Sequence, residues 1–275
     1  MRRPPSLPAS AALVLVLLAL PPCDALGGGG SAAWFSAARS GDVPTLRRLA
    51  KEAKRGEAST SLDGREEGSG QTALVAACLA GQAEAVRALL ELGADVGIPE
   101  KDGYTAMHAA AFQGRAEVAE VLISEAKLPA GGARARHRDG FEPLHRAAWG
   151  DHCECAKALV RGGAPVDAPA GVGGSTPMHE AARRGSARVI EVLVGLGAAV
   201  DSLDGAGETP LMTAVRSGQK RAVDALVEAG ADLRQKSPSG RMTARGIAKH
   251  IGAGDDMLDA LRSSRQQKKR PPTEL

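Results

Sequence analysis

Apolar residues in this chain recur three and four positions apart within short segments that end at glycine. Val86, Leu89 and Leu90 form one such set, and residues 189–196 contain another. This spacing places each set on one side of a helix, which predicts a helix with one buried face. The pattern therefore predicts an all-α protein rather than one with alternating strands.

The helical segments repeat at a fixed period. Residues 173–200 read GGSTPMHEAARRGSARVIEVLVGLGAAV, and a similar segment follows at residues 205–233. Six helix-start sites are separated by 33, 37, 34, 33 and 33 residues, and they begin at Thr72, Thr105, Glu142, Thr176, Thr209 and Met242. Self-similarity at this period is typical of stacked repeats, in which no unit can bury its apolar face alone.

The recurring residues mark helix boundaries. In Thr176-Pro177, the threonine can cap the free N–H groups of the first turn, and proline suits the first helical position. The glycine before Ala198 can adopt the left-handed conformation that closes a helix. Each unit is expected to contain a short helix and then a longer one.

These residues resemble the ankyrin repeat family over roughly residues 34–262. Trp34-Phe35 and the residues that follow resemble an N-terminal half-repeat. The resemblance implies an all-α solenoid of six to seven helix-turn-helix units joined by short turns or hairpins. It also implies that His108, His145 and His179 hydrogen-bond the loops of adjacent units, which is a structural role.

Two segments depart from the repeat. Residues 51–70 are polar and rich in glycine and serine, and we interpret them as a long mobile loop. Residues 127–138 replace an expected Gly-Ala ending and contain several basic side chains. We interpret this second segment as a solvated insertion, and contact with a partner is the alternative.

Composition and charge fit closely packed helices and narrow the range of functions. The chain is 43% hydrophobic but only 2% aromatic, so alanine, leucine, valine and glycine must supply most of the core. The formal net charge is +3, which gives no reason to expect binding to nucleic acid through overall charge.

The first 25 residues have the parts of a secretory signal peptide. Arg2 and Arg3 precede an apolar run over residues 11–20, and small residues up to Ala25 follow it. The run is about half of the roughly 20 residues that span a bilayer, so we expect cleavage and no stable membrane span. Residues 26–33 are expected to form a flexible leader. An uncleaved anchor or another targeting signal is the alternative.

Residues 263–275 form a basic, proline-interrupted tail that we expect to be disordered. The final Thr273-Glu274-Leu275 loosely resembles an endoplasmic reticulum retention signal. The predicted location is the secretory pathway. If residues 1–25 are not a signal peptide, residues 268–270 would instead suit a cytoplasmic or nuclear protein.

The sequence offers no catalytic, metal or cofactor site. Cys153 and Cys155 are two positions apart on a helix and point in different directions, so they cannot share a metal. Together with Cys78 they are expected to pack in the core, and a reactive thiol at Cys153 is the alternative. Residues 171–174 are glycine-rich but lack the order of a phosphate-binding loop.

The scarce aromatic residues fall at positions that, by the family resemblance, face a concave groove. Tyr104, Phe112, Phe141 and Trp149 occupy these positions in two adjacent units. The other positions expected to bind a partner are Leu79, Arg183, Arg184, Arg216, Arg241 and Lys249. Clustered aromatic and arginine side chains are typical of protein-binding hot spots.

The predicted function is therefore a non-enzymatic scaffold or adaptor. Its groove would bind a protein segment with an apolar anchor followed by acidic residues. A regulatory or targeting subunit, whose catalytic chain is separate, is the first alternative. An enzyme is the distant one.

Overall fold

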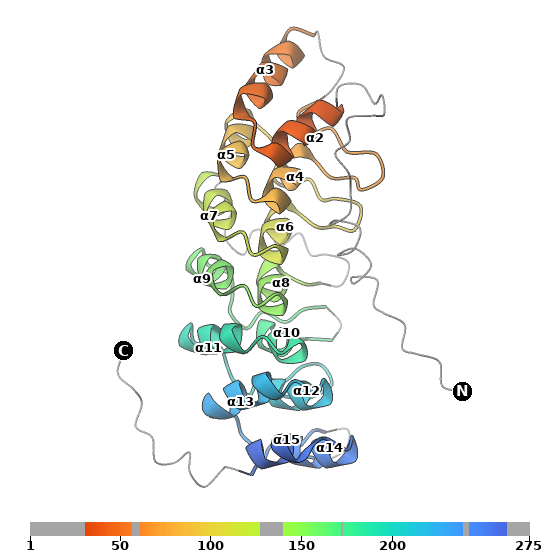
Figure 1. The fold of residues 1–275 in the computed structure, drawn as a ribbon, viewed down its shortest axis with the longest axis vertical. Coiled ribbons are helices and arrows are strands. Elements are labelled where there is room, and N and C mark those ends of the chain that lie inside the picture. The colour runs from red at the N-terminus through yellow and green to blue at the C-terminus, as the bar shows by residue number, and fades with distance from the viewer. Residues whose placement is uncertain (1–30, 57–60, 127–139, 172, 239–241, 263–275) are drawn as a thin grey trace, which may run out of the picture.

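The computed structural model describes residues 31–56, 61–126, 140–171, 173–238 and 242–262 as fourteen helices in seven pairs (Figure 1). The pairs are α2 (Ser31–Ser40) with α3 (Val43–Lys54), α4 (Ala73–Ala80) with α5 (Ala83–Glu91), α6 (Ala106–Phe112) with α7 (Ala116–Glu125), α8 (Pro143–Trp149) with α9 (Cys153–Arg161), α10 (Pro177–Arg184) with α11 (Ala187–Gly195), α12 (Pro210–Arg216) with α13 (Lys220–Glu228), and α14 (Ala244–His250) with α15 (Asp255–Ala260). Within the described residues there is no strand, and the one bridge joins Ala170 to Ser175. The predicted all-α fold is confirmed.

The pairs stack in chain order into an elongated solenoid (Figure 1). The first helices form one column, in which α4 packs on α2 and α6, and α10 packs on α8 and α12. The second helices form a parallel column, in which α7 packs on α5 and α9. Each unit therefore contacts only its neighbours, and stacking supplies the core.

Leucine and alanine build that core. One leucine of each central second helix is fully buried at 0% exposure, namely Leu89, Leu122, Leu159, Leu193 and Leu226. Burying each such side chain contributes roughly 2 kcal/mol. In the first helices, fully buried alanines such as Ala110 and Ala147 leave room for neighbouring helices to approach closely.

The first helices begin at the predicted sites in the five central units. Thr72 accepts a hydrogen bond from the backbone N–H of Val75, and Thr209 accepts one from Met212, both at 3.3 Å. Gly185 ends α10 with a φ of 85°, a conformation that favours glycine.

The last unit begins one residue later than the sequence pattern predicts. Thr243, and not Met242, caps α14 by accepting a hydrogen bond from the N–H of Gly246 at 3.2 Å. The aligned surface positions of this unit therefore shift from Lys249 and its neighbour to His250 and Ile251. Lys249 therefore lies one position before the aligned surface position; its side chain is exposed, and its contact with a partner stays a prediction.

Two predicted irregular segments are partly ordered. Residues 51–54 are the last turn of α3, and residues 31–33 belong to α2. Residues 61–70 form turns fixed to the stack, since Arg39 forms an ion pair with Glu66 at 2.9 Å. The sequence missed these contacts because polar, glycine-rich composition does not reveal a partner distant in the chain. Residues 1–25, 127–138 and 263–275 lie outside the described residues.

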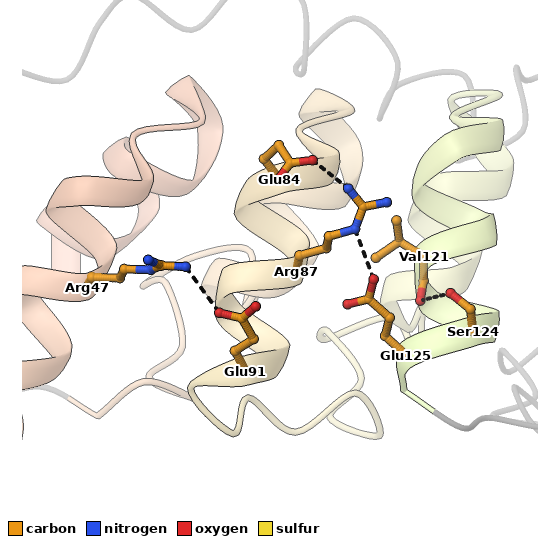
Figure 2. A network of polar contacts seen from close by, with 7 residues as sticks. All are labelled: Arg47, Glu84, Arg87, Glu91, Val121, Ser124 and Glu125. Atoms are coloured by element: carbon orange, nitrogen blue, oxygen red, sulfur yellow. Dashed lines mark hydrogen bonds and ion pairs between the residues drawn. The ribbon is translucent and has the colours of Figure 1, made fainter.

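Ion pairs connect the second helices of the first three units (Figure 2). Arg47 of α3 pairs with Glu91 of α5 at 3.2 Å, and Arg87 of α5 pairs with Glu125 of α7 at 2.9 Å. Arg87 also pairs with Glu84 on its own helix. These pairs are largely exposed to solvent, so each contributes little to stability.

Among the described helices, none is both long enough and apolar enough to cross a membrane.

Candidate protein-binding surface

Histidines in the first helices fix the loops that carry the candidate site. The Nδ1 atom of His145 accepts a hydrogen bond from the backbone N–H of Glu142 at 3.2 Å. Its Nε2 atom must then carry the proton, and it donates to the carbonyl of Ser175 in the next unit at 3.0 Å. His108 makes the corresponding bond to Phe141, and His179 to Glu208, both at 2.9 Å. The inter-repeat role implied for these three histidines is confirmed.

Burial keeps two of these histidines neutral. Desolvation lowers the pKa of His145 from 6.5 to about 4, and it also lowers the pKa of His179. A neutral ring has one donor and one acceptor nitrogen, which matches rings that accept at Nδ1 and donate to a carbonyl at Nε2.

The four predicted aromatic side chains lie half-buried on the surface formed by α6, α8 and the loops before them. Phe112 and Trp149 stack with ring centroids 6.2 Å apart and planes inclined by 17°. Tyr104 and Phe141 pack edge-on against the histidines of their own units, with centroid distances of 5.7 and 5.6 Å. The structure thus brings together the aromatic residues that the sequence placed in two adjacent units.

Two arginines pack against these aromatic rings. The guanidinium carbon of Arg146 lies 5.0 Å from the ring centroid of Tyr104 and 4.6 Å from that of Phe141. The guanidinium of Arg184 lies 4.5 Å from the centroid of Trp149. These distances are typical of cation–π contacts. We call the set Tyr104, Phe112, Phe141, Arg146, Trp149 and Arg184 the aromatic–arginine surface.

Arg146 was not predicted as a site residue. A signal for it was present, because it lies three positions before Trp149 and shares a helix face with it. His152 was also missed, and its Nε2 donates to the carbonyl of Phe112 at 3.0 Å. This bond holds the end of α6 from the next unit.

The predicted basic residues are partly neutralised. Arg183 lies 3.5 Å from Glu180 in an ion pair, and Arg216 pairs with Glu208 at 2.6 Å. Glu180 is buried, and desolvation raises the pKa of its carboxyl group. Arg241 lies outside the described residues. The C-terminal part of the surface therefore carries less unbalanced positive charge than a count of basic residues suggests.

Leu79 lies half-buried at the N-terminal end of the candidate surface. Its backbone carbonyl accepts a hydrogen bond from the Nε of Arg115 at 3.4 Å. The side chain packs partly against the core, and it belongs to the unit before the aromatic–arginine surface.

The three cysteines in the described residues are buried free thiols. Desolvation raises the pKa of Cys155 to about 12 and also raises the pKa of Cys78 and Cys153. Raised thiol pKa values disfavour the reactive thiolate. The same part of the chain contains no cluster of three histidine, cysteine or acidic residues that could hold a metal ion.

Comparison with known sequences finds partial relatives, among them one from Homo sapiens and one from Drosophila yakuba. The chain is 40% identical to Ankyrin repeat and SOCS box protein 18 of Homo sapiens over 70 residues, which cover 26% of this chain and 15% of that protein. It is 36% identical to the NF-kappa-B inhibitor cactus of Drosophila yakuba over 110 residues, covering 40% of this chain and 21% of that protein. The aligned parts thus span about a fifth or less of these relatives.

Many solved structures have a similar fold, among them two ankyrin repeat domains. The ankyrin repeat domain of Bcl-3, described as a unique member of the IkappaB protein family, has a TM-score of 0.71 at 26% identity, and the match covers 86% of this chain and all of that one. The human ASB11 ankyrin repeat domain has a TM-score of 0.63 at 24% identity, covering 87% of this chain and 98% of that one. The second likeness supports the fold alone.

The family model described as "Ankyrin repeats (3 copies)" matches residues 12–100, 34–131, 93–170 and 144–237. Together these matches span residues 12–237, which is most of the chain, and they include the helix pairs from α2 with α3 to α12 with α13. The chain therefore belongs to the ankyrin repeat family.

Proposed function

We propose that this protein is a non-enzymatic adaptor that binds a protein partner through the aromatic–arginine surface. The observation that carries the proposal is the stacked pair of Phe112 and Trp149 beside Arg184. Large aromatic and arginine side chains dominate binding energies in protein interfaces. Only 2% of the residues in this chain are aromatic. Four of these aromatic residues lie on the surface of two adjacent units, so this surface differs in composition from the rest of the protein.

The partner is expected to supply an apolar anchor and acidic residues. The half-buried rings offer apolar area, and the arginines beside them offer positive charge. One relative is named as an inhibitor of NF-kappa-B, so that protein acts on another protein. This supports a protein partner for the present chain without identifying it.

Truncation of the anchors tests the proposed function. Phe141→Ala and Trp149→Ala should each reduce recovery of the partner in cross-linking pull-downs analysed by mass spectrometry. Leu203→Ala is the matched control, since Leu203 is an apolar residue that is 51% exposed outside this surface. Circular dichroism should show unchanged helical content in all three variants. Recovery that is unchanged in both aromatic variants would refute the assignment of this surface.

We also propose that residues 1–25 direct the chain to the secretory pathway. Two arginines, an apolar run and small residues in that order support this proposal. N-terminal sequencing of the protein purified from culture medium or microsomes should find a start near Leu26. An intact N-terminus on a cytosolic protein would contradict it.

A further inference from the structure

The arginines near the candidate surface differ in whether a carboxylate neutralises them. Arg183 and Arg216 are each paired with a glutamate. Arg146 and Arg184, by contrast, have no carboxylate within 4.0 Å among the residues that the structure describes. Neither guanidinium is therefore held in an ion pair within the described residues, although the charge of Arg146 is close enough to the buried carboxyl group of Glu180 to attract it.

Aromatic contacts hold both of these guanidinium groups. Arg146 lies against the rings of Tyr104 and Phe141, and its Nε is buried without a hydrogen-bond partner. The residue as a whole is half-buried, so part of it is accessible to a partner. Arg184 is exposed and lies over the ring of Trp149. Ring contact leaves the N–H groups at the edge of a guanidinium available.

The rings are themselves fixed by the repeat architecture. The carbonyl of Phe141 accepts a hydrogen bond from His108 in the preceding unit, and the ring of Phe141 packs on His145. Trp149 ends α8 and stacks on Phe112. Each guanidinium therefore rests on a ring that is held in place before any partner arrives, which reduces the entropy lost on binding.

We propose that Arg146 and Arg184 each bind one carboxylate of an acidic partner segment, whose apolar residue packs on the Phe112–Trp149 stack. This inference rests on the proposed function and deepens it, because it assigns the acidic contacts to two residues inside the aromatic cluster. The planar fork of arginine donates two parallel hydrogen bonds to a carboxylate, which lysine cannot do.

A peptide carboxylate suits this surface better than a phosphate group. The carboxyl group of Glu180 already interacts electrostatically with Arg146, so it would repel a phosphate, with its charge of about −1.5 to −2, more strongly than a single carboxylate. Arg146 and Arg184 also belong to different units and contact different rings, whereas phosphate sites usually gather several arginines.

The test uses random twelve-residue peptides displayed on phage and selected on the full chain. Selected peptides should combine an aromatic or aliphatic residue with at least two aspartates or glutamates. Binding of a fluorescein-labelled selected peptide is then measured by fluorescence anisotropy. Arg146→Gln and Arg184→Gln should each weaken binding about 10- to 100-fold, the range expected for a lost charged hydrogen bond. Arg161→Gln, at the exposed end of α9, is the matched control and should bind as the unmodified chain does.

Two further measurements separate this geometry from general charge attraction. Arg146→Lys and Arg184→Lys keep the charge but lose the planar fork, so they should remain weakened. Replacing the peptide glutamates by glutamine should remove most of the effect of the arginine substitutions in a double-mutant cycle. Thermal melting by circular dichroism checks that every variant is folded.

The outcomes distinguish this inference from the proposed function. Peptides that require Trp149 but carry no acidic residues, or that bind Arg146→Gln and Arg184→Gln normally, would overturn the carboxylate assignment and leave the binding surface intact. A selection that yields no peptide sensitive to Trp149→Ala would contradict both. Full binding by the lysine variants would also refute the proposed geometry.

Discussion

Protonation of His145 should weaken the stack as the pH falls. The ring is buried, and both of its nitrogens are used, one accepting from Glu142 and the other donating to the carbonyl of Ser175. A second proton would convert the accepting nitrogen into a donor facing the N–H of Glu142. Burial lowers the pKa of the ring, because a charged imidazolium loses its hydration inside the protein.

The size and sign of the effect follow from this pKa. The value falls from 6.5 in the unfolded chain to about 4 in the folded protein. Between these two values the unfolded chain binds a proton that the folded chain does not, so folding becomes less favourable as the pH is lowered. This difference in pKa contributes roughly 3 kcal/mol to the free energy of unfolding. The contribution is fully present above pH 6.5 and is lost as the pH falls toward 4.

Urea unfolding of the full chain, followed by circular dichroism at a series of pH values, measures this effect. In His145→Gln, where the side chain no longer titrates, the midpoint should be lower near neutral pH and should depend less on pH. His250→Gln is the matched control, because His250 is exposed at the end of α14. Its pH dependence should equal that of the unmodified chain. Since repeat proteins can unfold in parts, midpoints rather than extrapolated free energies should be compared.

Two results would refute this reasoning. One is a pH dependence of His145→Gln that is the same as that of the unmodified chain. The other is a titration of the His145 ring, followed by nuclear magnetic resonance in the folded protein, with a midpoint near 6.5. Either would mean that the ring accepts a proton without disturbing the contact between units.

Three substitutions test other parts of the stack by urea unfolding. Leu159→Ala should cost about 3 kcal/mol, because the side chain is fully buried and its removal leaves a cavity; a cost below about 1 kcal/mol would contradict the core assignment. Gly114→Ala should lower the free energy of unfolding by about 2 kcal/mol or more, since φ at Gly114 is 67° and a Cβ there would collide with the ring of His152. Equal stability would show that the ring moves aside freely. Asp151→Ala should lower the free energy of unfolding by about 1 to 2 kcal/mol, because Asp151 has a φ of 58° and accepts a hydrogen bond from the backbone N–H of Val189 at 3.1 Å. An unchanged unfolding midpoint would refute this role.

The fold was predictable because the sequence repeats its boundary signals. Threonine, proline and glycine recur at the same positions, and each has a local physical role that needs no knowledge of distant contacts. The last unit was misplaced by one residue because residues 242–245 lack the proline that marks the three preceding starts, at Glu142, Thr176 and Thr209. The ordered turns at residues 61–70 were missed because Arg39, the partner of Glu66, lies 27 positions earlier.

The candidate site was predictable only in part. Positions of the aromatic residues followed from the repeat register, whereas their contacts did not. Pairing of Arg183 and Arg216 with glutamates depends on side-chain geometry, so charge counting overstated the basic character of the surface. Arg146 was missed because the positions chosen from the repeat alignment lie at the helix ends. Arg146 lies in the middle of α8, and it contacts Phe141, which precedes that helix.

The same hydrogen bonds that join the units also position the aromatic–arginine surface. His108 holds the carbonyl of Phe141, and His152 holds that of Phe112, so each ring is fixed by a neighbouring unit. Arg146 rests on one of these rings and Arg184 on Trp149, which stacks on the other. The position of the charges therefore depends on contacts between units and not on α8 alone. Loosening the stack would weaken binding even when no residue that contacts the partner is changed.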